Sequence, residues 1–339
     1  MCLRLNIVLF LTLLSFTVSA YSVSEENGYY LIEHTWRCEE DPYSMSFRIS
    51  KDLYDYYQND REHIVYQYKM NETTVPPCYS SFILSEHNRP IMQGIVKQFE
   101  DMASSKFNQV QLAVSFVQSI PYTYDSVSKG KEEYLRYPVE TLVDGSGDCE
   151  DKTALLAAIL YEMRTDFILL VLSDHMAVGI HDEHVDAERY LLFQDKKYYY
   201  VETTDPGWQI GRIPKDYHSA EIEPVIIEDT PSLLVKGVRL ESQPTLVFEK
   251  ALFELELDLH NLGPGKVTNL QVHVRLVTKE RKERLLAEEH FSLNDMQEGE
   301  LHTEKLSFKS YVRENCALQI ELTGDEIAPN CLSLQKINQ

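Results

Sequence analysis

The hydrophobic pattern of this chain changes its period near residue 234, and this change limits the possible folds more than any other feature. Before it, three segments repeat apolar residues at helical spacing, and four strand-like runs follow between 167 and 203. The helical segments are 90–104, 110–120 and 149–163. After it, apolar and polar residues alternate over 253–260 and 270–276, with a turn at 261–265. The pattern predicts an α+β domain followed by an all-β sandwich.

The length of 339 residues is enough for two domains, each with its own core. We predict a signal peptide over 1–20, an α+β domain over 21–233 with a β-rich N-terminal extension, and a β-sandwich over 234–339. Three prolines loosen the pattern just before the second boundary: Pro214, Pro224 and Pro231.

The chain is strongly acidic. Its formal net charge is −22, of which −18 belongs to residues 1–233. Such acidity argues against binding nucleic acid or an anionic membrane through a basic surface. Hydrophobic residues make up 43% of the chain, which excludes a disordered protein. An enzyme or an extracytoplasmic binding protein remains.

The first twenty residues have the features of a secretory signal. Arg4 gives a positive start, residues 7–16 are nearly all apolar, and Ala20 ends a stretch of small residues suited to signal peptidase. The apolar run is shorter than the ~20 residues that a membrane-spanning helix needs, and no later stretch of the sequence is long and apolar enough. We expect a cleaved signal and a secreted protein, or one held at the cell surface through the β-sandwich. An uncleaved signal-anchor is the alternative.

Export makes the cysteine count informative. Cys2 leaves with the signal, so an odd number of cysteines remains in an oxidising compartment. Grouped by their positions in the chain, the remaining residues predict two disulfides and one free thiol: Cys38–Cys78, Cys316–Cys331, and Cys149.

Cys149 opens the clearest of the predicted helices. Gly147 allows a tight entry, and Asp148 can cap the helix by accepting a backbone N–H. A thiol at a helix N-terminus feels partial positive charge, which lowers its pKa and favours the nucleophilic thiolate. Leu156, two turns later, shares its face, so Cys149 should point into the domain. The alternative is a small apolar core cysteine.

A thiol nucleophile needs a base, and the base needs a group that orients it. His175 begins an apolar strand-like run, and Glu202 lies in a later Tyr-rich run, between Val201 and Thr203. An ionisable residue in such a strand is unusual unless it has a partner. The spacings of 26 and 27 residues fit a helix followed by two adjacent strands. A surface histidine and a solvent-facing glutamate are the alternatives.

Five segments carry a resemblance to a known family: 137–142 (YPVETL), 147–152 (GDCEDK), 175–179 (HMAVG), 200–204 (YVETT) and 207–208 (GW). Over about residues 110–215 the chain resembles the transglutaminase-like superfamily, and within it the archaeal cysteine-protease-like branch. The resemblance implies a papain-like fold, with Cys149 as nucleophile and His175 as general base and acid. It also implies a carboxylate at position 202 that orients the imidazole.

One departure from the family pattern concerns that carboxylate. The superfamily most often has Asp at the third position, where this chain has Glu202, so Asp205 is the substitute to consider. The C-terminal part resembles, less specifically, the Ig-like or adhesion-type sandwiches attached to secreted archaeal and bacterial enzymes.

Two further residues are candidates for the cleft. Gln118 could donate to an oxyanion, since papain-like sites use an upstream side-chain amide, and Trp208 could wall the cleft. The alternatives are a polar helix position and an anchor for the turn at Gly207. The histidines and acids within 175–184 have metal-ligand residue types, but their spacing matches no known site. We therefore expect no metal and no cofactor.

We expect an exported, thiol-dependent acyl-transfer enzyme that acts on a protein or peptide substrate through an acyl-enzyme intermediate. Water as the second nucleophile would make it a peptidase or amidase, and an amine would make it a cross-linking transferase; hydrolysis is the weaker demand on the site. The rival is a non-catalytic cell-surface or scaffold protein that retains the fold. Glu202 in place of Asp, and the appended sandwich, favour that rival.

Overall fold

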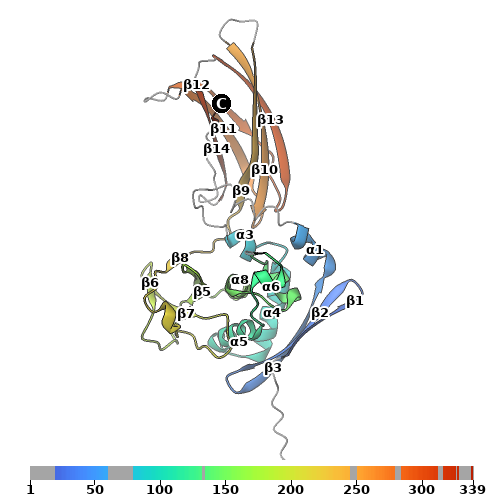
Figure 1. The fold of residues 1–339 in the computed structure, drawn as a ribbon, viewed down its shortest axis with the longest axis vertical. Coiled ribbons are helices and arrows are strands. Elements are labelled where there is room, and N and C mark those ends of the chain that lie inside the picture. Colours follow the sequence, from blue (N-terminus) through green and yellow to red (C-terminus); the bar gives the residue numbers. More distant parts are fainter. Residues whose placement is uncertain are drawn as a thin grey trace, which may run out of the picture.

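The computed structural model describes residues 20–59, 79–131, 134–244, 250–278, 284–311, 316–325, 327 and 337–338. They form a helix–sheet body and, above it in Figure 1, a second body made of strands. The described chain contains 27% helix and 41% strand, which confirms a mixed class and is compatible with the expected α+β organisation.

The helix–sheet body contains two antiparallel sheets with helices between them. The first sheet has the order β1-β2-β3 and the second the order β6-β7-β5-β4-β8. The elements up to the last helix are β1 (Ala20–Glu26), β2 (Tyr29–Cys38), β3 (Asp41–Ser50), α1 (Lys51–Asn59), α3 (Tyr79–Ile83), α4 (Arg89–Met102), α5 (Lys106–Ser119), α6 (Asp125–Ser128), α7 (Pro138–Asp144) and α8 (Cys149–Glu162). The second sheet follows as β4 (Phe167–Val171), β5 (Met176–Ile180), β6 (Leu191–Phe193), β7 (Lys196–Val201), the 3-10 helix η1 (Lys215–Tyr217) and β8 (Glu223–Val225).

Helix α8 lies at the centre of this body. It packs against α4, α5 and α7 on one side and against β4 and β5 on the other. Every residue from Asp151 to Leu160 is buried, so the helix is covered all round instead of along the single stripe that its spacing suggested. The start of α8 is thereby held in a fixed place relative to the second sheet.

The second body consists of two antiparallel sheets around one apolar core, with the orders β13-β10-β9 and β12-β11-β14-β15. Alternate residues face that core, among them Leu255 and Leu257 of β10 and Val272 and Val274 of β11, as the period of two predicts. Its strands are β9 (Ser232–Pro244), β10 (Lys250–Gly263), β11 (Thr268–Thr278), β12 (Leu285–Ser292), β13 (Leu301–Tyr311), β14 (Cys316–Asp325) and β15 (Ile337–Asn338).

The turn between β10 and β11 docks the second body onto the first. The Ser81 hydroxyl of α3 donates to the Gly263 carbonyl at 2.7 Å. The Glu298 carboxylate accepts from two backbone N–H groups, that of Glu86 at 3.0 Å and that of Gly265 at 2.8 Å. The two bodies therefore meet through hydrogen bonds at the end of α3.

The elements expected from the sequence are present, with small shifts at their ends. Helices α4, α5 and α8 correspond to the three predicted helices, and β4, β5, β6 and β7 to the four strand-like runs. The N-cap of α5 is Ser105, whose hydroxyl accepts from the Asn108 N–H at 3.2 Å. Asn108, just before the predicted helix over 110–120, also has the residue type of an N-cap, but the helix begins two residues earlier, so Asn108 lies inside it.

The first predicted disulfide is not formed in the structure. Cys38 is a free thiol at the turn from β2 into β3, whereas Tyr79, which follows Cys78, begins α3 at the opposite end of that sheet (Figure 1). A ten-residue strand spans roughly 33 Å, far more than a disulfide bridges. Cys78, Cys331 and the side chain of Cys316 lie outside the described residues, so Cys316–Cys331 stays a prediction.

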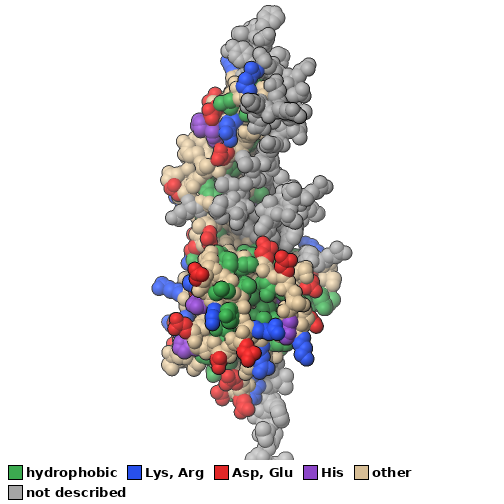
Figure 2. All heavy atoms as spheres, turned by 90° about the vertical axis from the view of Figure 1, so that its left-hand side faces the viewer, with side chains coloured by type: hydrophobic (Ala, Val, Ile, Leu, Met, Phe, Trp, Pro, Cys, Tyr) green, Lys and Arg blue, Asp and Glu red, His purple; other side chains and the backbone are tan. Residues whose placement is uncertain are grey.

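The predicted signal falls almost wholly outside the described part of the chain, which begins at Ala20 in β1. Within that part, none of the helices combines the length and the apolar character needed to cross a membrane. Figure 2 shows the face on the side of the second sheet, where hydrophobic side chains gather in the middle of the helix–sheet body and charged side chains surround them.

Candidate active site

Cys149 is a free thiol at the first residue of α8, and the turn before it fixes its position. Asp148 caps the helix as predicted, since its Oδ1 accepts from the N–H groups of Glu150 (3.1 Å) and Asp151 (3.3 Å). The Asp151 carboxylate accepts from the Asp148 N–H at 3.2 Å and completes a capping box. Gly147 has no room for a side chain, because a Cβ would lie 2.7 Å from Asp151 Cβ.

His175 and Glu202 meet at one end of two adjacent strands. His175 directly precedes β5 and Glu202 directly follows β7, and these strands pair antiparallel with Val178 opposite Val201. This register brings both residues to the same edge of the sheet. His175 Nε2 lies 3.1 Å from Glu202 Oε2, and the two side chains are 7% and 3% exposed. The adjacent strands that the spacing predicted are therefore present.

The Glu202 carboxylate is hydrogen-bonded at both oxygens. Oε1 accepts from the Thr203 N–H (3.0 Å), the Thr204 N–H (3.1 Å) and the Thr204 hydroxyl (2.7 Å). Oε2 accepts from the Tyr200 hydroxyl at 2.9 Å, beside its contact with His175. Burial by itself would raise the pKa of Glu202, but the hydrogen bond and charge of His175 and the Thr204 bonds lower it to about 2. The carboxylate is therefore ionised at neutral pH.

Cys149 and His175 line one pocket of about 290 Å³. Residues 171–176, from the end of β4 to the start of β5, form one part of the lining, and Tyr122, Tyr124, Asp125 and Ser126 form another. The Cys149 thiol accepts hydrogen bonds from the backbone N–H groups of Met176 and Glu150. The sulfur therefore lies against the residue that follows His175.

The thiol is not the stabilised thiolate that its place at a helix N-terminus predicted. Burial raises the pKa of Cys149 to about 12, and the charges of Asp148 and Glu150 act in the same direction. The two backbone hydrogen bonds lower the pKa but do not offset these effects. At neutral pH the resting thiol is protonated, so it needs a base to become a nucleophile.

Two tyrosines that sequence reasoning missed contact His175 and Glu202. The Tyr217 ring of η1 stacks on the His175 imidazole, with centroids 4.8 Å apart and planes at 4°. The Tyr200 hydroxyl binds Glu202 from two residues earlier in the chain. The spacing of two could have identified Tyr200, since alternate side chains of an extended segment lie on the same side. Nothing in the local sequence points to Tyr217.

Lys152, one turn into α8, is fully buried and was also missed. Its ammonium donates to the carbonyls of Gln118 (3.2 Å), Ile120 (2.7 Å) and Thr204 (2.8 Å). Burial lowers the pKa of Lys152 to about 7, although nearby carboxylates oppose the shift. The side chain ties the end of α5 to the residues that follow Glu202. A lysine among apolar residues of a central helix was the signal for it.

The other predicted site residues lie outside the pocket lining. The Gln118 amide donates both hydrogens to backbone carbonyls, those of Glu202 (2.8 Å) and Trp208 (2.9 Å). Gln118 therefore positions the Glu202 segment and is not the oxyanion donor considered from the sequence. Trp208 contributes its carbonyl to that contact, and its indole does not wall the pocket. Asp205 is exposed, and the carboxylate bonded to His175 is Glu202.

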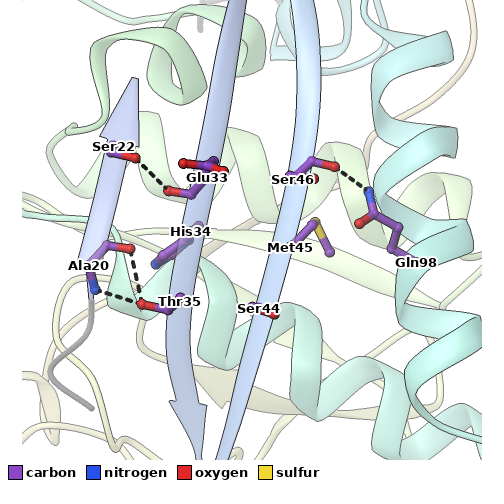
Figure 3. Close-up of a pocket in the computed structure, with 9 residues that line it drawn as sticks. All are labelled: Ala20, Ser22, Glu33, His34, Thr35, Ser44, Met45, Ser46 and Gln98. Atoms are coloured by element: carbon purple, nitrogen blue, oxygen red, sulfur yellow. Dashed lines mark hydrogen bonds between the residues drawn. The ribbon is translucent and has the colours of Figure 1, made fainter. Parts of the chain in front are cut away.

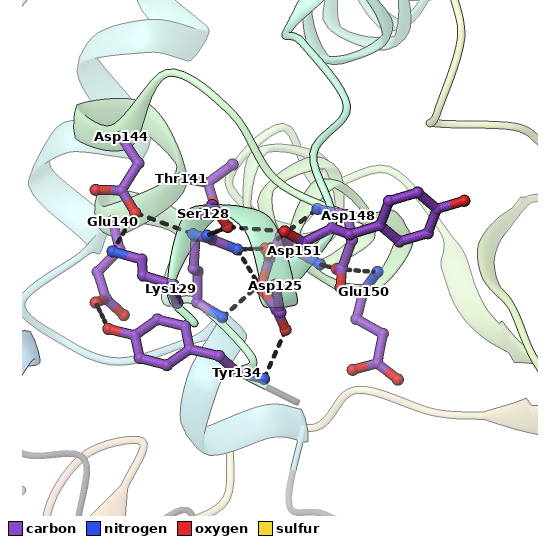
Figure 4. A network of polar contacts seen from close by, with 12 residues as sticks. Asp125, Ser128, Lys129, Tyr134, Glu140, Thr141, Asp144, Asp148, Glu150 and Asp151 are labelled. Atoms are coloured by element: carbon purple, nitrogen blue, oxygen red, sulfur yellow. Dashed lines mark hydrogen bonds and ion pairs between the residues drawn. The ribbon is translucent and has the colours of Figure 1, made fainter. Parts of the chain in front are cut away.

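A buried charge network supports the start of α8 (Figure 4). The Arg136 guanidinium is fully buried and donates to Asp125 (2.8 Å), Asp144 (2.9 Å) and Asp151. The Arg136 N–H also donates to Asp151 Oδ1 at 2.6 Å. Since Asp151 in turn holds the Asp148 N–H, one arginine fixes the cap from which Cys149 projects. These carboxylates raise the pKa of Arg136 against the effect of burial.

Replacing Arg136 with methionine is expected to cost about 3–5 kcal/mol of unfolding free energy, because it leaves buried carboxylates without their counter-ion. Burial and the charge of Asp148 raise the pKa of Asp151 to about 7 even with Arg136 present. A raised acid pKa means that the folded state binds the proton more tightly, so its contribution makes stability fall as the pH rises from about 4 to 7. Without Arg136, the pH range over which Asp151 lowers the stability extends to higher pH. The loss of unfolding free energy in Arg136→Met should therefore be larger at pH 8 than at pH 5.

Urea unfolding at the two pH values measures that deficit. The matched control is Arg89→Met, because Arg89 is half-exposed and pairs with Glu162 (2.9 Å) and Asp229 (3.1 Å). This variant should lose about 1 kcal/mol or less. Equal losses in the two variants, or a deficit of Arg136→Met that does not change with pH, would contradict the assignment.

Two groups of described side chains have the types and proximity of metal ligands: Asp125, Asp148 and Asp151, and His273, Glu288 and His290. In the first group, the Arg136 guanidinium already supplies the positive charge. In the second, His273 Nε2 contacts Glu288 at 2.6 Å, and the two imidazoles stack with centroids 3.9 Å apart. In both groups the side chains therefore already contact an arginine or one another.

A second pocket, of about 540 Å³, lies on the outer face of β1, β2 and β3 beside Gln98 of α4 (Figure 3). Its lining is mostly small and polar, and the described residues there include no nucleophile paired with a base. His34 contributes to the lining, but its Nε2 bonds to the Ser119 hydroxyl at 3.0 Å and its ring packs on Phe116. Unlike the Cys149 pocket, this one therefore has no cysteine in the described part of its lining.

Comparison with known proteins adds little to what the sequence motifs and the geometry of the site indicate. No protein-family model and no curated protein matches the chain. The solved structure of red sea bream transglutaminase is similar with a TM-score of 0.27 and 9% identity, over 90% of this chain and 72% of that chain. A protein assigned as a β-galactosidase from Bacteroides fragilis is similar with a TM-score of 0.25 and 10% identity, over 51% of this chain and 28% of that chain. Both similarities are too weak to carry an argument, so the transglutaminase-like resemblance rests on the sequence motifs.

Proposed function

We propose that this chain is a thiol-dependent acyl-transfer enzyme with Cys149 as nucleophile, His175 as general base and acid, and Glu202 as the group that orients the imidazole. One observation carries the proposal. A histidine bonded to a buried, ionised carboxylate lines the same pocket as a cysteine at the start of a central helix. The sequence motifs of the transglutaminase-like superfamily point to the same residues, with a papain-like fold for residues 21–233.

The contacts of His175 support different roles for its two ring nitrogens. Because Glu202 takes Nε2, the nitrogen that accepts the thiol proton is Nδ1. The thiolate then attacks an amide carbonyl carbon, and the imidazolium returns the proton to the leaving amine as the C–N bond breaks. This leaves a thioester at Cys149. Water attacks the thioester as Nδ1 takes its proton, which releases the acid and restores the thiol.

Hydrolysis makes the protein a peptidase or amidase, and we favour it because it needs no second binding site. An amine in place of water would make it a cross-linking transferase. We also propose that the chain is exported by residues 1–20 and acts outside the cytoplasm. The Ig-like sandwich over 234–339 would then be a separate domain suited to attachment at the cell surface.

One observation favours the second candidate, a non-catalytic scaffold of the same fold. The pKa of Cys149 is raised to about 12, and a thiol that stays protonated is not a nucleophile unless the base removes its proton. The two candidates therefore differ in whether His175 acts on Cys149.

The pH dependence of Cys149 alkylation by iodoacetamide separates them, with mass spectrometry locating the label. If His175 takes the proton, the rate between pH 7 and 9 should depend only weakly on pH, because general-base removal of the thiol proton does not require free thiolate. In His175→Ala the rate should instead rise about tenfold per pH unit from 6 to 9, because only the small thiolate fraction reacts.

Cys38 provides an internal control in the same samples. It is a half-buried free thiol whose pKa is raised by burial, and His175 should have no effect on it. Identical pH profiles of Cys149 in the two proteins would favour the scaffold.

A further inference from the structure

The pocket that holds Cys149 and His175 is strongly acidic. Among its described lining residues, four are carboxylates and none is Lys or Arg. The four are Asp125, Asp148, Glu150 and Asp174. Arg136 holds Asp125 at 2.8 Å, and the N–H groups of α8 hold Asp148. Glu150 directly follows the nucleophile in sequence, and Asp174 directly precedes the base. A group that enters this pocket therefore meets carboxylates that neighbour both Cys149 and His175 in the chain.

Two tyrosines form an exposed aromatic wall of the same pocket. Tyr122 is 38% exposed and Tyr124 is 65% exposed, and their rings meet edge to face with centroids 5.2 Å apart. The negative face of an aromatic ring attracts Lys and Arg side chains, and carboxylates bind them through charge-assisted hydrogen bonds. Aromatic rings beside carboxylates therefore suit an organic cation better than an anion or a neutral apolar group.

We propose that this pocket binds a Lys or Arg side chain of a peptide substrate, next to the amide bond that Cys149 attacks. The proposal rests on the proposed function, since it names the substrate class of that site. Glu150 and Asp174 supply the charge for binding, and Tyr122 and Tyr124 supply the aromatic surface.

Binding of such a side chain would also affect the chemistry. The charges of Asp148 and Glu150 help to keep the Cys149 thiol protonated, and a bound cation would offset them. The thiol would then lose its proton to His175 more readily when a basic peptide occupies the pocket. An acidic peptide would have the opposite effect, so discrimination against it should be strong.

The charge of the pocket can be measured without turnover. Cys149 is modified with 2-aminoethyl methanethiosulfonate, a cation, and with 2-sulfonatoethyl methanethiosulfonate, an anion. In each case the thiolate displaces methanesulfinate and forms a mixed disulfide, whose position mass spectrometry assigns. The ratio of the two rates is divided by the same ratio for 2-mercaptoethanol, which removes the intrinsic reactivity of the reagents. At low salt this normalised ratio should exceed about 10, and it should fall toward 1 in 1 M NaCl.

Glu150→Gln should lower the normalised ratio by at least about twofold. Glu100→Gln is the matched control, since it changes the net charge equally at an exposed position on α4 and should leave the ratio unchanged. A ratio near 1 in the unmodified protein, or an equal fall in both variants, would overturn the proposal.

The second measurement compares peptides that differ in one residue beside the scissile bond: Arg, Gln or Glu. kcat/KM should be at least about tenfold higher for Arg than for Gln, and lowest for Glu. Equal values for the three peptides would overturn the substrate class while leaving the proposed function in place. If no peptide is turned over although the charge ratio at Cys149 is high, the proposed function fails, and the substrate proposal fails with it.

Discussion

Replacing Cys149 with alanine is expected to abolish turnover of peptide and amide substrates, with a loss in kcat of about 10⁶-fold if the thioester pathway is the route. The reason is that the neighbouring groups cannot substitute for the sulfur. In the proposed mechanism His175, which Glu202 holds at 3.1 Å, acts as the base, and without the Cys149 thiol only water remains for it to activate. Initial rates on a basic chromogenic peptide amide measure the loss.

The matched control is Cys38→Ala, which removes the other free thiol among the described residues. Cys38 lies at the turn between β2 and β3, so this variant should keep its activity within about twofold. Cys149→Ala should remain folded, because the change is small and Asp148 still caps α8. Circular dichroism checks this. If Cys149→Ala is folded and retains turnover, the acyl-enzyme mechanism is wrong.

The start of α8 could be predicted from the sequence because its determinants are local. The apolar run, the capping carboxylate of Asp148 and the tight approach at Gly147 all lie within a few residues of Cys149. The same holds for the strands that bear His175 and Glu202. Their spacing fits adjacent strands, and the observed register brings the two side chains together.

The supporting residues could not be predicted, because their partners are distant in the chain. Tyr217 reaches His175 from a 3-10 helix beyond β7, and Lys152 reaches three carbonyls on two different segments. Gln118 was one candidate for an oxyanion donor, because papain-like sites use an upstream side-chain amide. The fold instead places backbone carbonyls at both of its amide hydrogens. Such contacts depend on how loops cross the end of the sheet, and the local hydrophobic pattern of the sequence does not indicate how they do so.

The state of the Cys149 thiol shows how a correct local rule can give a wrong electrostatic result. A helix N-terminus does favour a thiolate, by about 1 kcal/mol or less in exposed settings. Here burial has the largest effect, and Asp148 and Glu150 add negative charge beside the sulfur. The acidic neighbours are visible in the sequence, but the degree of burial is not. In the proposed mechanism, the thiol would therefore depend on His175 for activation and would respond to positive charge from a substrate.

Replacing Glu202 with glutamine is expected to lower kcat/KM by about 10²–10⁴-fold, through the tautomer of His175. Oε1 of Glu202 accepts three hydrogen bonds from Thr203 and Thr204, so the carbonyl oxygen of the new amide should occupy that position. Its NH₂ group then faces His175 Nε2, with the Tyr200 hydroxyl able to accept its second hydrogen. An Nε2 that accepts a hydrogen bond leaves the proton on Nδ1, and a protonated Nδ1 cannot take the proton of Cys149.

The pH dependence of stability provides a second readout of the same change. The pKa of Glu202 is lowered from 4.5 to about 2, so its carboxylate stabilises the folded state above pH 4.5, and this contribution is lost only as the pH falls toward 2. Glu202→Gln should therefore be less stable than the unmodified protein at pH 7, and the difference should shrink toward pH 2. Asp205→Asn, which removes the exposed alternative carboxylate, should keep kcat/KM within about twofold. Loss of activity in Asp205→Asn but not in Glu202→Gln would transfer the orienting role to Asp205.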